Sequence, residues 1–130
     1  MKPLIKVTAA IILKNNKVLI AQRKQDDPFK LKWEFPGGKI EKDETPEKCL
    51  NRELTEELGI SAEIGELFLR VFHSYPDFDI ELLAYQVNKF SNKPKNNTHQ
   101  KLSWVAVGNL PAFDFLEADI PVIKKLQSIH

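Results

Sequence analysis

Three glutamates gather in one short segment, RELTEELGI, at residues 52–60. If this segment is helical, Glu53, Glu56 and Glu57 stand at positions i, i+3 and i+4 and share one face of the helix. Like charges at this spacing destabilise a helix by roughly 0.2–0.5 kcal/mol per pair, so folding alone does not favour them. We therefore expect a positively charged group to lie against this face.

The chemistry available to these side chains is that of hard oxygen donors. Carboxylates suit Mg²⁺ or Mn²⁺ better than zinc, and Mg²⁺ commonly shares its ligand shell with substrate phosphates. Glu44 lies nearby in sequence, and the turn at Gly37 and Gly38 can bring a backbone carbonyl to the same ion. The alternative is a solvated charged face in which Arg52 pairs with Glu56. The local prediction is an acidic helix face that binds a divalent metal and, through it, a phosphate chain.

The helix that carries these glutamates has recognisable ends. Thr45 is a good N-cap, Pro46 suits the first helical position, and Gly59 suits the residue after the last turn. Leucines at positions 50, 54 and 58 recur every four residues and predict a buried stripe. This stripe lies roughly 100° around the helix from the glutamates, so one side packs while the other faces a groove.

Strand patterns flank this helix on both sides. Apolar runs predict strands at 5–13, 17–23, 65–75, 78–88 and 102–107, with a hairpin between the first two and a second helix at 117–129. Strands on both sides of a long helix, with another helix at the end, indicate an α/β fold with a mixed β-sheet sandwiched between α-helices. No linker or repeat is visible, so we expect one domain over residues 1–130.

Composition excludes several classes of protein. Nineteen basic and eighteen acidic side chains give a formal charge of +1, which offers no broad attraction to nucleic acid or to an anionic membrane. Cys49 is the one cysteine, which rules out an intrachain disulfide and a cysteine metal cage. No stretch approaches the roughly 20 apolar residues of a membrane span, and the N-terminal apolar run reads as a strand. We expect a cytoplasmic protein.

A longer pattern surrounds the glutamates and resembles the Nudix box, GX5EX7REUXEEXGU, in which U is a bulky aliphatic residue. It is met by Gly38, Glu44, Arg52, Glu53, Leu54, Glu56, Glu57, Gly59 and Ile60. The resemblance implies the Nudix fold and metal-dependent hydrolysis of a nucleoside diphosphate linked to another group. It also implies site roles: Glu53, Glu56 and Glu57 bind the metal with a carbonyl of Gly37 or Gly38, Arg52 orients the glutamates, and Glu44 supports them.

The rest of the chain is similar to the MutT-like branch of nucleotide-pool enzymes, through segments such as AQR, WEFPGGKIE and EADIPVIKKL. This similarity implies substrate-binding roles for Arg23, Glu34, Phe35, Phe78 and Asp119. Asp119 stands where oxidised-purine enzymes have an asparagine, and the CTP pyrophosphohydrolase branch shares the ADIP sequence. Some relatives have a glutamate at the position of Thr98 that helps with metal binding or base catalysis. Threonine cannot do this, so we expect Glu44, Glu53 or His99 to take that role.

The implied activity is a Mg²⁺-dependent nucleoside triphosphate pyrophosphohydrolase, with Mn²⁺ as a possible substitute metal. The substrate alternatives are 8-oxo-dGTP and related oxidised nucleotides, CTP or 5-methyl-dCTP, and the 5′ triphosphate of RNA. A non-catalytic nucleotide-binding module is a remote alternative, because such modules usually lose box glutamates. The expected partner is the nucleotide, without a stable nucleic-acid complex or a membrane, and the expected assembly is a monomer or weak homodimer.

Overall fold

A computed structural model of the protein describes all residues from 1 to 130. Its strands are β1 (Leu4–Lys14), β2 (Lys17–Gln22), β3 (Trp33–Glu34), β4 (Gly37–Lys39), β5 (Ser61–Ser74), β6 (Asp79–Ser91) and β7 (Lys101–Ala106). Its helices are α1 (Pro46–Leu58) and α2 (Ile120–Ile129), and two short 3₁₀ helices, η1 (Val107–Ala112) and η2 (Glu117–Asp119), precede α2. Neither α1 nor α2 is long and apolar enough to cross a membrane.

The strands form a mixed sheet, as predicted, and β1 lies at its centre. The path β3-β2-β1-β6-β5 is extended by β4, which pairs with β1, and by β7, which pairs with β2. β1 and β6 run parallel over Leu4 to Ile12, whereas the other pairs are antiparallel. The β1–β2 hairpin turns at Asn15 and Asn16, whose φ angles of 54° and 62° are those of a tight two-residue turn.

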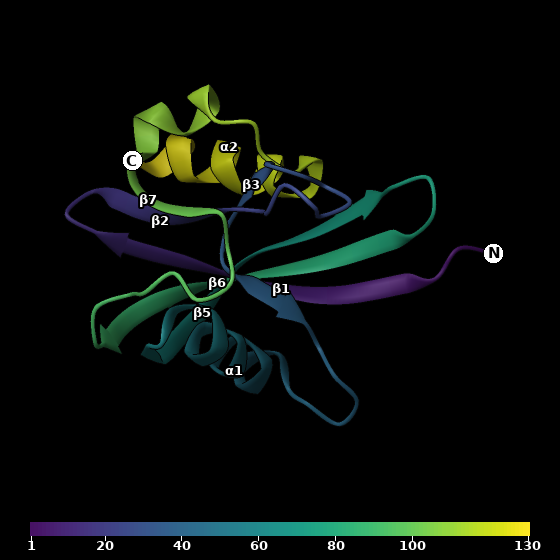
Figure 1. Cartoon of the computed structure of the whole chain (residues 1–130), viewed down its shortest axis with the longest axis horizontal. Coiled ribbons are helices and arrows are strands. Elements are labelled where there is room, and N and C mark those ends of the chain that lie inside the picture. The colour runs from purple at the N-terminus through teal and green to yellow at the C-terminus, as the bar shows by residue number, and fades with distance from the viewer.

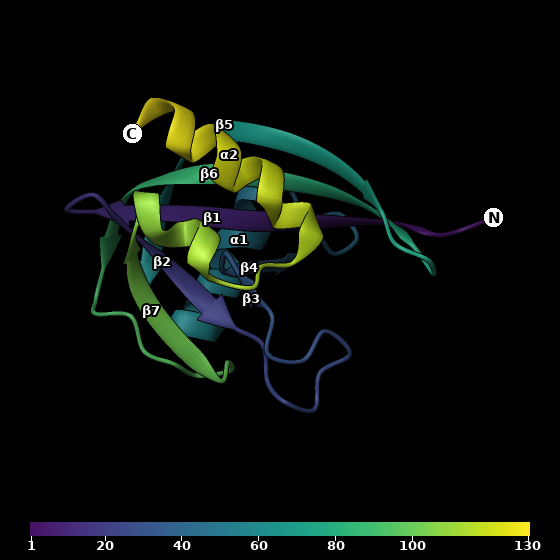
Figure 2. The ribbon, with the colours of Figure 1, turned by 90° about the horizontal axis from the view of Figure 1, so that it is seen from above.

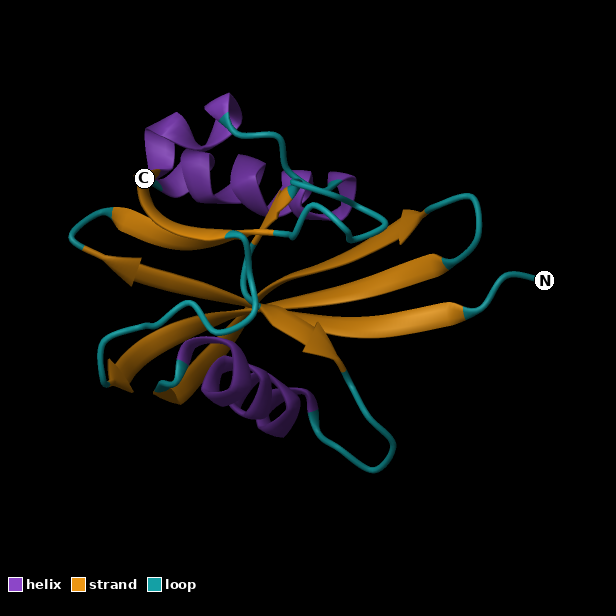
Figure 3. Cartoon of the chain, in the orientation of Figure 1, coloured by secondary structure: helices purple, strands orange, loops and turns teal.

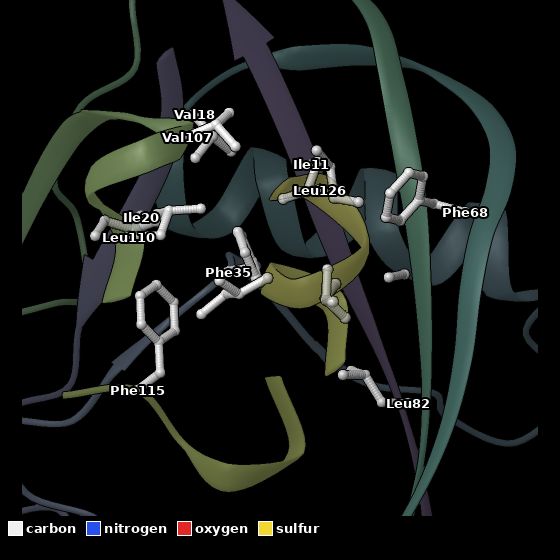
Figure 4. Close-up of a cluster of buried hydrophobic side chains, with 14 of the residues drawn as sticks. Ile11, Val18, Ile20, Phe35, Phe68, Leu82, Val107, Leu110, Phe115 and Leu126 are labelled. Atoms are coloured by element: carbon white, nitrogen blue, oxygen red, sulfur yellow. The ribbon is translucent and has the colours of Figure 1, made fainter. Parts of the chain in front are cut away.

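The two helices cover opposite faces of this sheet (Figures 1 and 3). Successive side chains of a strand point to opposite faces, and β1 is apolar on both. Ala9 and Ile11 pack on the α2 side, in the cluster that Figure 4 draws, whereas Ala10 and Ile12 pack on the α1 side. The view from above shows α2 crossing over the central strands (Figure 2). The predicted sandwich of sheet and helices is therefore confirmed.

The predicted box helix is also confirmed, because its signals are local. Thr45 Oγ1 accepts a hydrogen bond from Lys48 N at 3.2 Å. At the other end Gly59 has the left-handed conformation, with φ 66°, and its N–H donates to Thr55 O. The leucines at 50, 54 and 58 are fully buried against the sheet. This packing fixes which side of the helix the glutamates face.

Several predicted boundaries were wrong. WEFPGGKIE contains two short strands, β3 and β4, beside the predicted turn, and β5 begins at Ser61 instead of residue 65. Register shifts between Glu63 and Leu69 interrupt the pairing of β5 with β6, and such bulges break the alternation by which a strand is recognised. The closing helix starts as the 3₁₀ turn η2, and only residues from Ile120 onward are α-helical.

Candidate active site

The glutamate face of α1 lies against the glycine turn of β4. β4 pairs with β1 through Thr8 and Ala9, so close that a Cβ on Gly37 would stand 2.0 Å from Thr8 O. A Cβ on Gly38 would meet the Glu53 carboxylate, at 2.4 Å from Cδ and 2.5 Å from Oε2. Only glycine lets the backbone come this close to the strand and to the carboxylate. The glycine turn and the acidic face, predicted to share a site, are adjacent in the structure.

Arg52 is the positive group that lies against these carboxylates. Its Nε and Nη2 donate to the two oxygens of Glu44, at 2.7 and 3.0 Å, and its Nη1 donates to Glu53 Oε1 at 2.7 Å. The Arg52 hydrogen bonds, helped by the Glu41 N–H, lower the pKa of Glu44 to about 2. Glu56 Oε2 lies farther away, at 3.5 Å from Nη1, and its side chain is mostly exposed. Arg52 is thus fixed by Glu44 and in turn holds Glu53.

Glu57 is the buried member of the acidic face. The residue is 8% exposed, and its Oε1 has no hydrogen-bond partner. Burial, together with the neighbouring Glu53 and Glu34 carboxylates, raises the pKa of Glu57 to about 10. An unpaired carboxylate oxygen away from water costs free energy, which a cation at that point would offset. The proton is therefore favoured on Glu57 until a cation replaces it.

These donors fit a hard divalent cation. In this conformation no three carboxylate, imidazole or thiolate groups converge on one point, because Arg52 holds Glu53 Oε1 and attracts Glu56. Glu53 Oε2 is free of Arg52 and faces Gly38, and Glu57 Oε1 is free and buried. Glu53 Oε2, which lies beside Gly38, and the buried Glu57 Oε1 are hard oxygen donors of the kind suited to Mg²⁺ or Mn²⁺.

A cavity of about 590 Å³ opens beside Glu57 and the glycine turn. Its lining joins Glu57, Gly37 and Gly38 to Asp119 and to an aromatic group of Phe29, Tyr75 and Phe78. The ring centroid of Tyr75 lies 5.2 Å from that of Phe29 and 5.1 Å from that of Phe78. Phe78, which sequence alone left open between a base-stacking and a core position, is half-buried and on the cavity wall. Carboxylates beside flat aromatic walls suit a ligand that carries phosphates and a planar ring.

A chain of polar contacts crosses the cavity wall. Arg23 donates to both oxygens of Asp27, at 2.7 and 2.9 Å, and to Glu34 Oε1 at 2.8 Å. The second oxygen of Glu34 lies 2.9 Å from His99 Nε2. Asp27 Oδ2 also accepts the Phe29 N–H, which fixes the loop that carries this aromatic ring. The predicted residues Arg23 and Glu34 therefore line the cavity as members of one network, which also positions Phe29.

Asp119 and Phe35 meet through the Phe35 backbone. Asp119 is 4% exposed and lines the cavity, and its Oδ2 accepts the Phe35 N–H at 3.3 Å. Burial, with the nearby Glu34 charge, raises the pKa of Asp119 well above its ordinary value. Asp119 occupies the N-cap position of α2, but its side chain makes no capping hydrogen bond, so the alternative that it only caps this helix was wrong.

The Phe35 ring lies away from the cavity wall on which it was predicted. It is 3% exposed and packs with Phe115 in the core, where Figure 4 shows it among the side chains around α2. Glu34 precedes it in an extended segment, where neighbouring side chains point to opposite sides. With Glu34 toward the cavity, Phe35 points into the core, and its contribution to the site is its N–H.

Sequence reasoning missed several residues of this wall. Asp27, Phe29 and Tyr75 line the cavity, but a polar loop and a strand end carry no spacing that marks them. His99 was weighed as a base, yet its Nε2 is engaged with Glu34. Cys49 matches its predicted packing role, because it is fully buried and burial raises the pKa of its thiol.

Substituting Gly38 with alanine is expected to disturb the site without unfolding the protein. The new Cβ collides with the far end of the flexible Glu53 side chain, which can move, and moving it displaces a predicted metal ligand. We expect metal affinity to fall at least about tenfold, within the range for changes beside metal ligands. Calorimetric titration of Mg²⁺ measures this.

Gly108→Ala is the matched control, because a Cβ there meets nothing within 4 Å. Equal Mg²⁺ affinity in the Gly38 and Gly108 variants would contradict the placement of Glu53 in the metal site.

Comparison with known proteins agrees with this geometry. The NUDIX domain family model matches residues 4–126. The chain is 39% identical to the 8-oxo-dGTP diphosphatase of Escherichia coli K12 over 115 residues, covering 88% of this chain and 89% of that protein. It is 36% identical to the CTP pyrophosphohydrolase of the same organism over 127 residues, covering 98% and 94%. The solution structure of the E. coli ORF135 protein superposes with a TM-score of 0.88 at 35% identity, covering 98% of this chain and 91% of that one.

Proposed function

The chain belongs to the Nudix hydrolase family and is a MutT-type pyrophosphohydrolase, and from this premise we propose that it sanitises the nucleotide pool. The proposed reaction converts an oxidised or modified nucleoside triphosphate, foremost 8-oxo-dGTP, and water to the monophosphate and pyrophosphate. The observation that carries this proposal is the cavity that places Glu57 of the acidic face together with Asp119 and three aromatic rings. One end of such a cavity suits phosphates and the other suits a base.

The family's divalent metal would be held by Glu53, Glu56, Glu57 and a carbonyl of Gly37 or Gly38. When bound, Mg²⁺ neutralises phosphate oxygens and acidifies a coordinated water. The chain's own contribution is to present the carboxylates in one orientation. Glu44 accepts two hydrogen bonds from Arg52, and Arg52 leaves Glu53 Oε2 free toward Gly38.

We assign the proton-accepting role to Glu53. Glu44 is a poor base, because Arg52 binds both of its oxygens and lowers its pKa to about 2. His99 Nε2 is engaged with Glu34. Thr98 lines the cavity but has no carboxylate. Glu53 keeps one oxygen, Oε2, that Arg52 does not bind, and it can accept a proton when Glu56 and Glu57 hold the metal, because one oxygen cannot be ligand and base at once.

CTP or 5-methyl-dCTP hydrolysis is the second candidate. An acidic Asp119 in the cavity, and the similarity to a CTP pyrophosphohydrolase over nearly the whole chain, favour it. Hydrolysis of RNA 5′ triphosphates ranks third, because the +1 net charge gives little general attraction to a long polyanion.

For a nucleotide-pool enzyme we propose a cytoplasmic location and a monomer or weak homodimer as the working form.

A panel of triphosphates tests the proposal. With millimolar Mg²⁺, we expect pyrophosphate release and the highest kcat/KM for 8-oxo-dGTP among dGTP, 8-oxo-dGTP, CTP, 5-methyl-dCTP and a short 5′-triphosphorylated RNA. A higher kcat/KM for CTP and 5-methyl-dCTP would establish the second candidate instead. Release of orthophosphate without pyrophosphate would contradict the proposed reaction with any of the nucleotides.

A further inference from the structure

The loop between β6 and β7 closes the C-terminal end of α1. The last carbonyls of a helix have no partner within it and need donors from elsewhere. Here Lys95 N donates to Leu58 O at 2.9 Å and Asn97 N donates to Glu57 O at 3.1 Å. No basic side chain lies in the last turn of α1 to do this instead. The loop therefore sets where the helix end lies.

Asn97 is distinguished within this loop because it binds the backbone of two acidic-face residues. Its N–H donates to Glu57 O, and its side-chain Nδ2 donates to Glu56 O at 3.2 Å. It does not line the cavity, whereas the next two residues, Thr98 and His99, do. Asn97 thus binds the backbone of Glu56 and Glu57, and it directly precedes two residues of the cavity wall in the chain.

We propose that Asn97 is a positioning residue that sets the direction of the Glu56 and Glu57 carboxylates. This inference assumes the proposed metal-dependent function. Two adjacent carbonyls held from outside fix the rotation of the last helical turn, and the side chains of that turn rotate with it. Through Thr98 and His99 the same short segment connects the metal site to the nucleotide cavity.

Asn97→Ala removes the donor to Glu56 O and keeps the backbone donor to Glu57 O. We expect the dissociation constant for Mg²⁺ in the absence of nucleotide to rise about tenfold, the lower end for changes that support metal ligands. At saturating Mg²⁺, kcat and the KM for nucleotide should return to within about twofold of wild type. The reason is that Asn97 does not line the nucleotide cavity. Titration calorimetry with Mg²⁺, and electron paramagnetic resonance with Mn²⁺, measure the binding directly.

Asn51→Ala is the matched control for a general loss of stability. Asn51 lies on α1, and its Oδ1 accepts the Ala62 N–H at 3.1 Å, a similar bond that involves no metal-site backbone. We expect both variants to lose melting temperature but only the Asn97 variant to lose Mg²⁺ affinity. Asn97→Asp, which puts an acceptor in place of the donor facing Glu56 O, should weaken Mg²⁺ binding at least as much as alanine.

The possible results distinguish a failure of the Asn97 positioning role from a failure of the proposed metal-dependent function. Unchanged Mg²⁺ affinity in Asn97→Ala, or an equal loss in Asn51→Ala, would overturn the positioning role while leaving the function intact. A wild-type protein that binds neither Mg²⁺ nor Mn²⁺, with or without nucleotide, would instead overturn the proposed function itself.

Discussion

Glutamine in place of Glu57 is expected to lower kcat by about a hundredfold or more, the scale of a lost electrostatic contact in a preorganised site. Glutamine keeps the size of the side chain, so the fold should survive. It cannot carry the negative charge that a divalent cation needs, and Glu57 Oε1 is the buried oxygen without another partner. Glu53→Gln should give a similar loss, since it removes the free oxygen beside Gly38. Steady-state kinetics at saturating Mg²⁺ measure both.

The same substitution should change how stability depends on pH. The folded pKa of Glu57 is raised from 4.5 to about 10, so the metal-free folded state favours the protonated form. Stability of the wild type is therefore highest below pH 4.5 with respect to this group, and it falls as pH rises toward 10. Glutamine cannot ionise and removes this fall. We expect metal-free Glu57→Gln to melt at a higher temperature than wild type at pH 8, and the difference to shrink toward pH 5.

Glu47→Gln is the control, because it removes one charge from the exposed first turn of the same helix. It should leave kcat unchanged and lower stability by no more than about 1 kcal/mol through the lost helix-dipole contact. Near-normal turnover in Glu57→Gln would end the assignment of the acidic face as the metal site. A lower metal-free melting temperature at pH 8 would show that Glu57 is not held protonated.

The acidic helix could be predicted in detail because each of its signals is local. A cap at Thr45, a proline at 46, a leucine stripe and a terminal glycine all lie within one helix and agree with one another. The spacing of Glu53, Glu56 and Glu57 then fixes their common face without knowledge of the sheet. The mixed sheet followed from apolar runs that pack on both faces of β1.

The cavity wall could not be predicted in the same way, because its members meet only through strand pairing. Arg23 follows β2, Glu34 lies on β3 and His99 precedes β7, and β2 pairs with both of the other strands. That pairing brings together residues 65 positions apart in sequence, His99 and Glu34. No short-range periodicity encodes such a contact. The direction of Phe35 was missed for a related reason, since it depends on which neighbour faces the cavity.

Asp119→Asn is expected to change the order of preferred bases more than the maximal rate. Asp119 lines the cavity at a distance in sequence from the acidic face, and its pKa is raised well above the ordinary value by burial and by the Glu34 charge. A protonated carboxyl both donates and accepts a hydrogen bond, whereas an ionised one only accepts. At low pH the wild type therefore presents a donor and an acceptor to the base, as an asparagine does.

The order of preference should consequently depend on pH in the wild type and not in the variant. As pH rises through the pKa of Asp119, the carboxyl loses its donor, and bases with a carbonyl oxygen facing it are disfavoured. The cytosine amine and the N–H groups of 8-oxoguanine remain acceptable to a carboxylate. Asparagine keeps its donor at every pH, so its order of preference should stay constant across the pH range over which the enzyme is folded.

The size of the effect follows from one charged hydrogen bond, worth roughly 1.5–3 kcal/mol, or about ten- to a hundredfold in discrimination. We expect the ratio of kcat/KM values between 8-oxo-dGTP and CTP to change by that factor, with 5-methyl-dCTP following CTP. The measurement is kcat/KM for the three nucleotides in both proteins, at both ends of the pH range. Three parallel losses of equal size would mean that Asp119 supports the cavity wall through its contact with the Phe35 N–H, and that the base is read by other groups.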